Sequence, residues 1–279
     1  MAIEIKTLRV SIIMPAWNAA QTIGAAVESV LLQDMADWEL IVVDDGSTDG
    51  TPALLAAFDD PRIRVISQKN AGVSVARNRA LDMAQGLYVT FLDADDALPH
   101  GALRLRADLL DARPDADFAD GAVSVRDANL EQELRVYTPQ HEGPLRDRLI
   151  ALDETAFFNV CYMVRAAAIG STRFQTGLSH CEDLLFHLKI ANSRSALRVI
   201  CPEVVYLYRS RPGSAMSNLA GLESGYDALI TSVKEMDGIS PAAQTALRRR
   251  VRRIMVRSWL RRGRFYRALR AGLHGSRGA

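Results

Sequence analysis

Short apolar runs alternate with helical stretches over residues 9–92, and this alternation restricts the fold more than any other feature of the chain. The runs are rich in β-branched residues and have the length of buried strands; they lie at residues 9–14, 40–43, 62–67 and 87–92. Helices are expected over 19–33, where apolar residues recur at helical spacing, over 73–85, and after Thr51-Pro52. Strands that alternate with helices predict a parallel sheet with right-handed crossovers. We therefore expect an α/β fold with a mostly parallel central sheet and helices on both faces.

Polar clusters follow the predicted strands at the points where the strands end. They comprise residues 15–18 (Pro-Ala-Trp-Asn), 44–49 (Asp-Asp-Gly-Ser-Thr-Asp), 68–72 (Gln-Lys-Asn-Ala-Gly) and 93–96 (Asp-Ala-Asp-Asp). Ligands bind at the carboxyl ends of strands in sheets of this kind. No Gly-x-Gly-x-x-Gly follows the first strand and the chain has no Gly-Lys-Ser/Thr loop, which argues against a dinucleotide-binding domain and excludes a P-loop.

The acidic cluster 93–96 indicates one kind of chemistry more directly than the others. Carboxylates this close together resist ionisation unless a cation lies between them. Mg²⁺ or Mn²⁺ suits such a group, since these hard ions prefer oxygen ligands and often take only one or two carboxylates besides substrate phosphates. The alternative is a solvated acidic turn that caps a helix.

Charge and cysteine content bound the remaining possibilities for the 279-residue chain. All 33 acidic residues precede Ser240, whereas residues 241–279 hold twelve arginines, which predicts a boundary near residues 238–241. Cys161, Cys181 and Cys201 form no Cys-x-x-Cys pair, so we expect buried thiols in a reducing compartment rather than disulfides or a zinc site with His180. The N-terminal segment does not resemble a signal peptide, and no apolar run is long enough to span a membrane, so a cytoplasmic protein is expected.

Four motifs together resemble the family 2 glycosyltransferases with the GT-A fold. They are Val10-Ser-Ile-Ile-Met-Pro-Ala-Trp-Asn18, Ile41-Val-Val-Asp-Asp-Gly-Ser-Thr-Asp49, Asn70-Ala-Gly-Val-Ser-Val-Ala-Arg-Asn78 and Phe91-Leu-Asp-Ala-Asp-Asp96. The resemblance covers residues 8–110 in the order and spacing of the family and extends to a Glu-Asp pair, Glu182-Asp183, at the start of a helical stretch. It implies a catalytic domain over 1–238, with a nucleotide-sugar half (1–110) and an acceptor half (111–218), followed by a basic helical tail (239–279).

The resemblance implies an inverting transferase of the hexosyl or N-acetylhexosaminyl type. It would move a sugar from a nucleoside diphosphate donor, by default a UDP-sugar, to a hydroxyl of a carbohydrate or lipid-linked saccharide in surface polysaccharide or glycoconjugate synthesis. Asp95 and Asp93 would bind the divalent metal, Mn²⁺ or Mg²⁺, and Asp183 would act as the base beside Glu182. The donor would contact Pro15, Ala16, Asn18, Asp44, Asp45, Asn70, Gly72, Arg77, Asp93 and Ala94.

Each assignment has a structural alternative. The loop residues can face solvent, and Asp49 can cap the helix that begins near Thr51. Arg77 can pair with a loop carboxylate instead of touching the donor. Glu182 and Asp183 can occupy a helix N-terminus because its dipole favours acids.

Further strands are expected at 117–125, 156–165 and 203–211. The last enters a loop with Arg209, Arg211 and Ser214, which resembles the family's lid over the diphosphate; arginine suits phosphate geometry. An exposed turn is the alternative for this segment.

Residues 242–273 place apolar residues among arginines in a basic amphipathic pattern. This segment can lie on an anionic membrane surface beside lipid-linked acceptors, at the inner face of the membrane, or pack its apolar side onto the acidic catalytic domain. A third possibility, nucleic-acid binding by the arginines, fits the interleaved apolar residues less well, so no nucleic-acid partner is expected. The alternative to an enzyme is a non-catalytic sugar-nucleotide binding or scaffold subunit.

Overall fold

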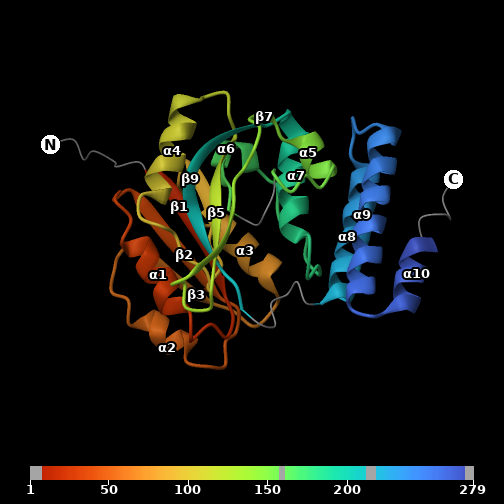
Figure 1. Cartoon of the computed structure of the whole chain (residues 1–279). Helices are drawn as coiled ribbons and strands as arrows, with labels where there is room; N and C mark the ends of the chain where they lie inside the picture. Colours follow the sequence, from red (N-terminus) through yellow and green to blue (C-terminus); the bar gives the residue numbers. More distant parts are fainter. Residues whose placement is uncertain (1–7, 157–160, 212–217, 274–279) are drawn as a thin grey trace.

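A computed structural model describes residues 8–156, 161–211 and 218–273 of the protein. A nine-stranded sheet in the order β3-β2-β1-β4-β8-β5-β9-β7, with β6 paired to β5, forms its centre (Figure 1). The strands are β1 (Val10–Ala16), β2 (Trp38–Asp44), β3 (Ile63–Ser67), β4 (Tyr88–Phe91), β5 (Phe118–Arg126), β6 (Glu133–Tyr137), β7 (Gly143–Pro144), β8 (Met163–Arg165) and β9 (Leu197–Arg209). The helices are α1 (Ile23–Leu31), α2 (Thr51–Ala56), α3 (Val73–Leu81), α4 (Ala102–Ala112), α5 (Arg146–Ile150), α6 (Ala166–Ile169), α7 (Glu182–Arg194), α8 (Leu219–Glu235), α9 (Pro241–Arg261) and α10 (Phe265–Leu273).

The first four strands form the parallel sheet that the alternating pattern predicts. β1 lies between β2 and β4, and β3 flanks β2, all in parallel register. Ala16 is opposite Asp44, and Asp44 is opposite Ser67, so the three strands end at the same edge. This edge carries the loops in which the sequence places its polar clusters.

Beyond β4, antiparallel pairs join the parallel ones. β8 lies antiparallel to both β4 and β5, whereas β5 pairs with β9 in parallel. β5 and β6 form an antiparallel hairpin. Their connection is short, and a short connection can join antiparallel strands, whereas parallel strands need a long crossover. The apolar pattern of the sequence indicates which segments are buried, but it does not indicate which strands pair in the second half of the sheet.

Two expected strand boundaries were wrong. Residues 157–160 of the predicted strand 156–165 lie outside the described part of the chain; of the described residues in that range, Met163–Arg165 are in strand conformation. The strand expected at 203–211 begins earlier, at Leu197, and ends at Arg209.

Helices cover both faces of the sheet and enclose two apolar cores, as expected. Neighbouring strand residues point to opposite faces. Ile12 of β1 therefore packs in one core with Val27 of α1 and Leu103 of α4. Ile13 packs in the other core, which includes Leu185 of α7.

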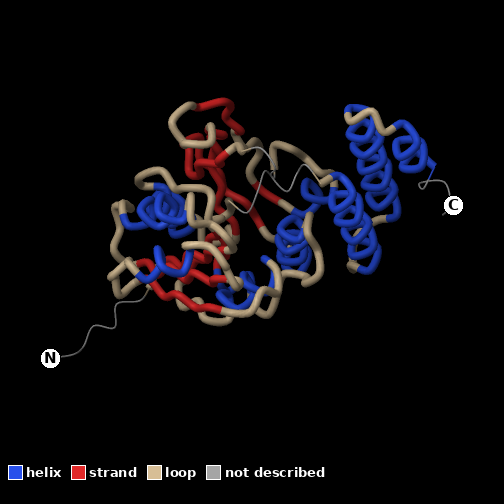
Figure 2. Tube along the Cα trace, turned by 90° about the horizontal axis from the view of Figure 1, so that it is seen from below, coloured by secondary structure: helices blue, strands red, loops and turns tan. Residues whose placement is uncertain are grey.

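The C-terminal helices form a layer at one end of the molecule, with α8 beside α9 and α10 beyond α9 (Figures 1 and 2). Leu247, Val251, Met255 and Trp259 recur every fourth residue along α9 and join the same core as α7. One apolar side of the basic segment thus packs onto the preceding part of the chain, one of the two possibilities that its sequence left open. Among the described helices, none combines the length and apolar character needed to cross a bilayer.

Candidate active site

The loops at the carboxyl edge of the parallel strands hold one another through side-chain contacts. Pro15 and Ala16 end β1, and the Ala16 carbonyl accepts from the backbone N–H of Asp45 at 2.8 Å. Asn18 follows with a left-handed backbone (φ 49°), and its side-chain oxygen accepts from the N–H of Thr48 at 2.8 Å. Buried Asp44 ends β2 and accepts from the N–H of Ser47 at 3.1 Å.

Asp45, one of the expected contacts to the nucleotide-sugar donor, fixes the loop that leads into α3. Its Oδ1 accepts from the Gln68 amide at 2.7 Å and from the Ala71 N–H at 2.8 Å, while Oδ2 accepts from the Gly72 N–H at 2.8 Å. Asn70 donates to the Asp45 carbonyl at 2.9 Å. A carboxylate offers about four acceptor positions. The three contacts leave room for a base N–H, so the predicted role of Asp45 stays a prediction.

Asp49 contacts the first residue of helix α2, in agreement with the alternative interpretation that it caps this helix. Its Oδ1 accepts from the Thr51 N–H at 3.0 Å and from the Thr51 hydroxyl at 2.6 Å. Asp49 thus stabilises the beginning of α2.

The acidic turn after β4 gathers three carboxylates. One oxygen each of Asp93, Asp95 and Asp96 lies within 4.8 Å of the others, and no other metal-competent cluster of His, Cys, Asp and Glu occurs among the described residues. Burial raises the pKa of Asp95 and the neighbouring Asp93 raises it further. A divalent cation would relieve this repulsion, and an all-oxygen donor set fits Mg²⁺ or Mn²⁺. Ala94 is buried between the two predicted ligands. His180 and the three cysteines form no such cluster among the described residues.

Asp96 anchors this turn to the end of β9. Its Oδ1 accepts from the N–H of Arg209 at 2.8 Å, and its Oδ2 accepts from the Tyr206 hydroxyl at 2.8 Å. The same hydroxyl accepts from the N–H of Asp93 at 3.2 Å. Tyr206 was not among the predicted site residues. Its signal in the sequence is an aromatic hydroxyl inside a buried strand, because a buried hydroxyl needs a hydrogen-bond partner.

Arg77 joins the acidic turn to the distant Glu-Asp pair. From its place on α3 it donates through Nη2 to Asp93 at 2.7 Å and through Nη1 to Glu182 at 3.0 Å. Burial alone would lower the pKa of Arg77, but Asp93 and Glu182 raise it, so the guanidinium stays charged. The two acidic motifs therefore lie in one site, and Arg77 pairs with carboxylates, as its structural alternative states.

Glu182 and Asp183 begin α7, as the sequence indicates. Glu182 is buried against Arg77, so it does more than complement the helix dipole. Asp183 is half-buried, and its Oδ1 accepts from the Leu184 N–H at 2.7 Å. Loss of water raises the pKa of Asp183 to about 7, and the charge of Glu182 adds to the rise. A carboxylate with a pKa near neutrality is suited to accepting a proton at physiological pH.

The residues expected in a lid differ in what they contact. The Arg209 guanidinium donates to the carbonyls of Asp95 and Ala128, both at 2.5 Å, so it braces the backbone here. Exposed Arg211 pairs with Asp95 at 2.6 Å. Ser214 lies outside the described residues.

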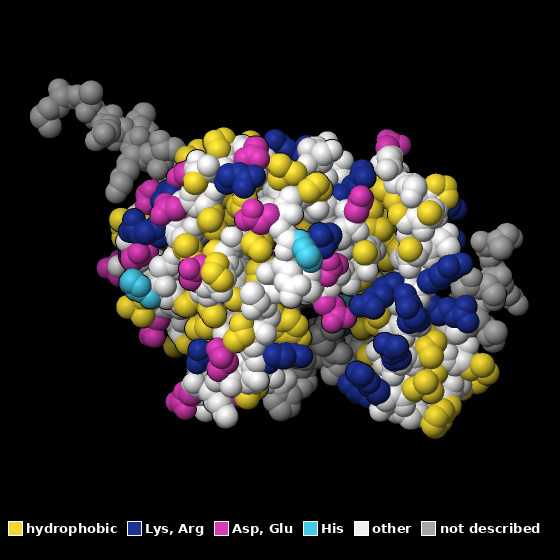
Figure 3. Space-filling view, turned by 45° about the horizontal axis from the view of Figure 1, so that its top comes forward, with side chains coloured by type: hydrophobic (Ala, Val, Ile, Leu, Met, Phe, Trp, Pro, Cys, Tyr) yellow, Lys and Arg dark blue, Asp and Glu magenta, His cyan; other side chains and the backbone are white. Residues whose placement is uncertain are grey.

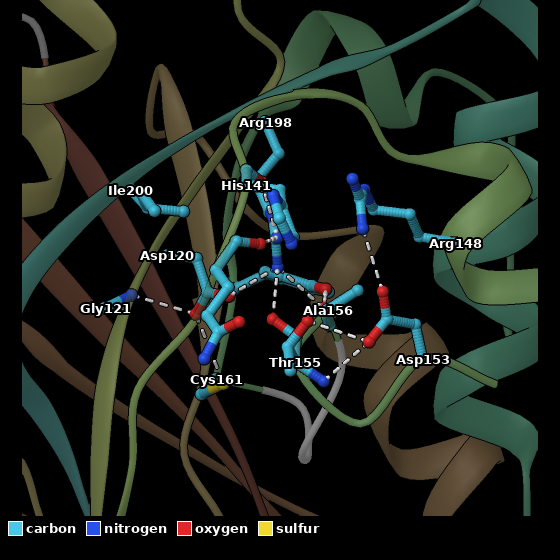
Figure 4. A network of polar contacts seen from close by, with 12 residues as sticks. Asp120, Gly121, His141, Arg148, Asp153, Thr155, Ala156, Cys161, Arg198 and Ile200 are labelled. Atoms are coloured by element: carbon cyan, nitrogen blue, oxygen red, sulfur yellow. Dashed lines mark hydrogen bonds and ion pairs between the residues drawn. The ribbon is translucent and has the colours of Figure 1, made fainter.

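A second buried ion pair braces the later part of the sheet (Figure 4). Arg198 of β9 pairs with Asp120 of β5 at 3.2 Å. It also donates to the carbonyls of Gln140 at 2.5 Å, His141 at 2.7 Å and Ala156 at 2.9 Å. Burial raises the pKa of Asp120 to about 6, although Arg198 opposes the rise. This network fastens residues 140–156 to the sheet. No local pattern in the sequence indicated it.

Comparison with known proteins gives a family and a fold. The family model described as Glycosyl transferase family 2 matches residues 11–170. The Escherichia coli enzyme named UDP-Glc:alpha-D-GlcNAc-diphosphoundecaprenol beta-1,3-glucosyltransferase WfgD is 49% identical over 88 residues, which is 31% of this chain and 35% of that protein. The chain's matched segments span about a third of the length of the first curated relatives.

Two solved structures share the architecture. S. aureus TarS 1-349 in complex with UDP-GlcNAc has a TM-score of 0.73 at 21% identity, covering 96% of this chain and 81% of that one. The mannosyltransferase PcManGT from Pyrobaculum calidifontis, in complex with GDP-Man and Mn2+, has a TM-score of 0.61 at 21% identity, covering 97% of this chain and 76% of that one. The mixed α/β sheet thus agrees with the expected GT-A fold.

Proposed function

The chain belongs to glycosyl transferase family 2, and from this we propose that it is an inverting, metal-dependent glycosyltransferase that moves a hexosyl or N-acetylhexosaminyl group from a UDP-sugar to an acceptor hydroxyl. The observation that carries the proposal is the contact of one guanidinium, that of Arg77, with both Asp93 and Glu182. It brings the acidic turn for the leaving diphosphate and the Glu-Asp pair for the acceptor into one site.

The donor assignment rests on the loops around Asn18, Asp44, Asp45 and Asn70, which meet at the carboxyl edge of the sheet. WfgD is named for UDP-Glc and a diphosphoundecaprenol-linked acceptor, and the TarS structure is titled with UDP-GlcNAc. These names support a UDP-sugar and a saccharide acceptor, free or lipid-linked, for this chain as well. We assign the reaction to surface polysaccharide or glycoconjugate synthesis on the cytoplasmic side of the membrane.

Asp95 and Asp93 would hold Mn²⁺ or Mg²⁺, because their oxygens lie close together and burial raises the pKa of Asp95. A divalent ion bound there would neutralise the charge that develops on the departing diphosphate. Asp96 keeps its hydrogen bonds to Tyr206 and Arg209 and holds the turn in place.

Asp183 is the proposed base. An acceptor alcohol is a weak nucleophile at neutral pH, and proton removal by a positioned carboxylate contributes typically about 10²–10⁴-fold. Glu182 raises the proton affinity of Asp183 and is itself held by Arg77. Attack of the acceptor oxygen opposite the diphosphate, in one displacement, inverts the anomeric carbon.

The test is a panel of nucleotide sugars with Mn²⁺, read first by thermal shift and then by product formation with saccharide acceptors. A ligand that binds only the folded state raises the melting temperature. The true donor should raise it most, and transfer should disappear in EDTA and in Asp95→Asn. Binding of donor and metal without turnover for any acceptor would indicate the non-catalytic subunit instead, and full activity in EDTA would contradict the metal assignment.

A further inference from the structure

Helix α9 has a second apolar side that does not face the catalytic domain. Its inner stripe, at Leu247, Val251, Met255 and Trp259, is buried in the core. Val256 and Leu260 lie on another side, where they line a groove together with Phe265 and Leu269 of α10. The groove is therefore built by the two C-terminal helices and lies outside the proposed active site.

Large apolar side chains are strongly exposed around this groove. The exposed fractions are 45% for Leu260, 71% for Phe265, 80% for Tyr266 and 63% for Leu269. In α10 the small residues Ala268 and Ala271 are buried, whereas Phe265, Tyr266 and Leu269 are exposed. Single exposed apolar residues are ordinary, but a cluster of this size marks an interaction surface.

The same surface is strongly basic. Arg252, Arg253 and Arg257 line the groove beside the apolar residues, and the chain has no acidic residue after Asp237. Figure 3 shows dark-blue side chains gathered beside yellow ones on the part of the molecule formed by the C-terminal helices. The surface thus combines apolar side chains with positive charge and no negative charge.

We propose that this surface, defined by Arg253, Arg257, Leu260, Phe265, Tyr266 and Leu269, docks on a bilayer that contains anionic lipids. Arginines beside aromatic and aliphatic residues match such a bilayer, in which the charges meet lipid phosphates and the apolar side chains enter the acyl boundary. A nucleic acid would neutralise the arginines but leave the apolar cluster in water. The docking does not depend on catalysis; only its purpose, holding the site near a lipid-linked acceptor, rests on the proposed function.

The test is sedimentation of the full chain with phosphatidylcholine vesicles and with mixed phosphatidylcholine–phosphatidylglycerol vesicles. We expect binding to the mixed vesicles only, with a strong decrease at high salt. Arg253→Gln with Arg257→Gln should weaken binding roughly fivefold for each arginine. Phe265→Ser with Leu269→Ser should weaken it at least as much.

Matched control variants distinguish binding through this surface from nonspecific electrostatic or hydrophobic binding by other exposed residues. Arg113→Gln with Arg135→Gln removes two exposed arginines of the catalytic domain, and Leu32→Ser removes an exposed leucine whose 70% exposure is close to that of Phe265. These variants should bind vesicles like the parent. Retained thermal stabilisation by UDP with Mn²⁺, or an unchanged unfolding curve if UDP does not bind, shows that the docking variants are folded.

Equal binding to both kinds of vesicle, or equal losses in the control variants, would overturn the proposal. The proposal would also be overturned if the chain did not bind vesicles but bound duplex DNA, or associated with itself, through the same residues. A dimer lost in Phe265→Ser with Leu269→Ser would identify a second copy of the chain as the occupant.

Discussion

Asp93 and Glu182 bind the same guanidinium, that of Arg77, at 2.7 and 3.0 Å. Asp93 follows strand β4, and Glu182 begins helix α7, so the contact joins two segments that are remote in the sequence. Because a buried arginine keeps its charge between two carboxylates, it holds the turn with the predicted metal ligands beside the proposed base.

Arg77→Met should destabilise the fold and abolish transfer. Removal of the cation leaves Asp93 and buried Glu182 without their partner, at a cost of about 3 kcal/mol. Arg77→Lys should recover part of the stability but little activity, because an ammonium cannot span both carboxylates as the guanidinium fork does. Urea unfolding and a transfer assay measure the two effects.

The matched control is Arg104→Met. Arg104 pairs with Asp34 at 2.8 Å on the surface, so its loss should cost about 1 kcal/mol or less. Equal destabilisation by the two substitutions would show that burial of the Arg77 pairs contributes nothing.

The rate of transfer should rise with pH and level off above about pH 7. The proposed base works in its deprotonated form, and the pKa of Asp183 is raised to about 7 by burial and by Glu182. The profile of kcat/KM reports this ionisation in the free enzyme. A flat profile between pH 5 and 8 would exclude Asp183 as the base.

Glu182→Gln should move the midpoint of that profile to lower pH. The substitution removes a negative neighbour that disfavours ionisation of Asp183, so the pKa of Asp183 falls. Measurement of kcat/KM against pH for the variant gives the shift. A midpoint that moves upward would contradict the assigned repulsion.

Tyr206→Phe should weaken metal binding and destabilise the fold by about 1–3 kcal/mol, since buried Asp96 loses a donor. Titration with Mn²⁺ and urea unfolding test the two effects. Tyr266→Phe, at an exposed position, should change neither. Unchanged Mn²⁺ affinity in Tyr206→Phe would show that the hydrogen bond from Tyr206 to Asp96 does not affect metal binding.

Arg211→Ala should strengthen Mn²⁺ binding in the absence of donor. Arg211 pairs with Asp95 at 2.6 Å, so the metal competes with an exposed ion pair, which corresponds to about a two- to fivefold change in affinity. Isothermal titration gives the affinity. Weaker binding in the variant would mean that Arg211 assists the metal rather than competing with it.

The first half of the fold was predictable because each of its strands is a compact apolar run. Ile12 and Ile13 show the buried pattern, and the polar clusters after β1, β2 and β4 indicate the binding edge. Parallel strands bring their carboxyl ends together, so local patterns were enough to predict which loops share that edge.

The later half depends on tertiary pairing that no local pattern encodes. β8 contributes three residues between β4 and β5, and the buried pair of Arg198 and Asp120 joins two distant strands. Arg77 could be assigned to the site by motif, but its partner Glu182 became evident only when α7 was placed. The hydrogen bonds of the Tyr206 hydroxyl to the acidic turn were likewise not predictable, because they depend on where β9 lies relative to that turn.

The most direct test is a crystal of the protein soaked with UDP and Mn²⁺, with the metal located by its anomalous scattering. We expect a metal peak at the carboxylates of Asp93 and Asp95, shared with the diphosphate and beside Asp183. A manganese ion and diphosphate bound away from this turn, or remote from Asp183, would contradict the proposed site.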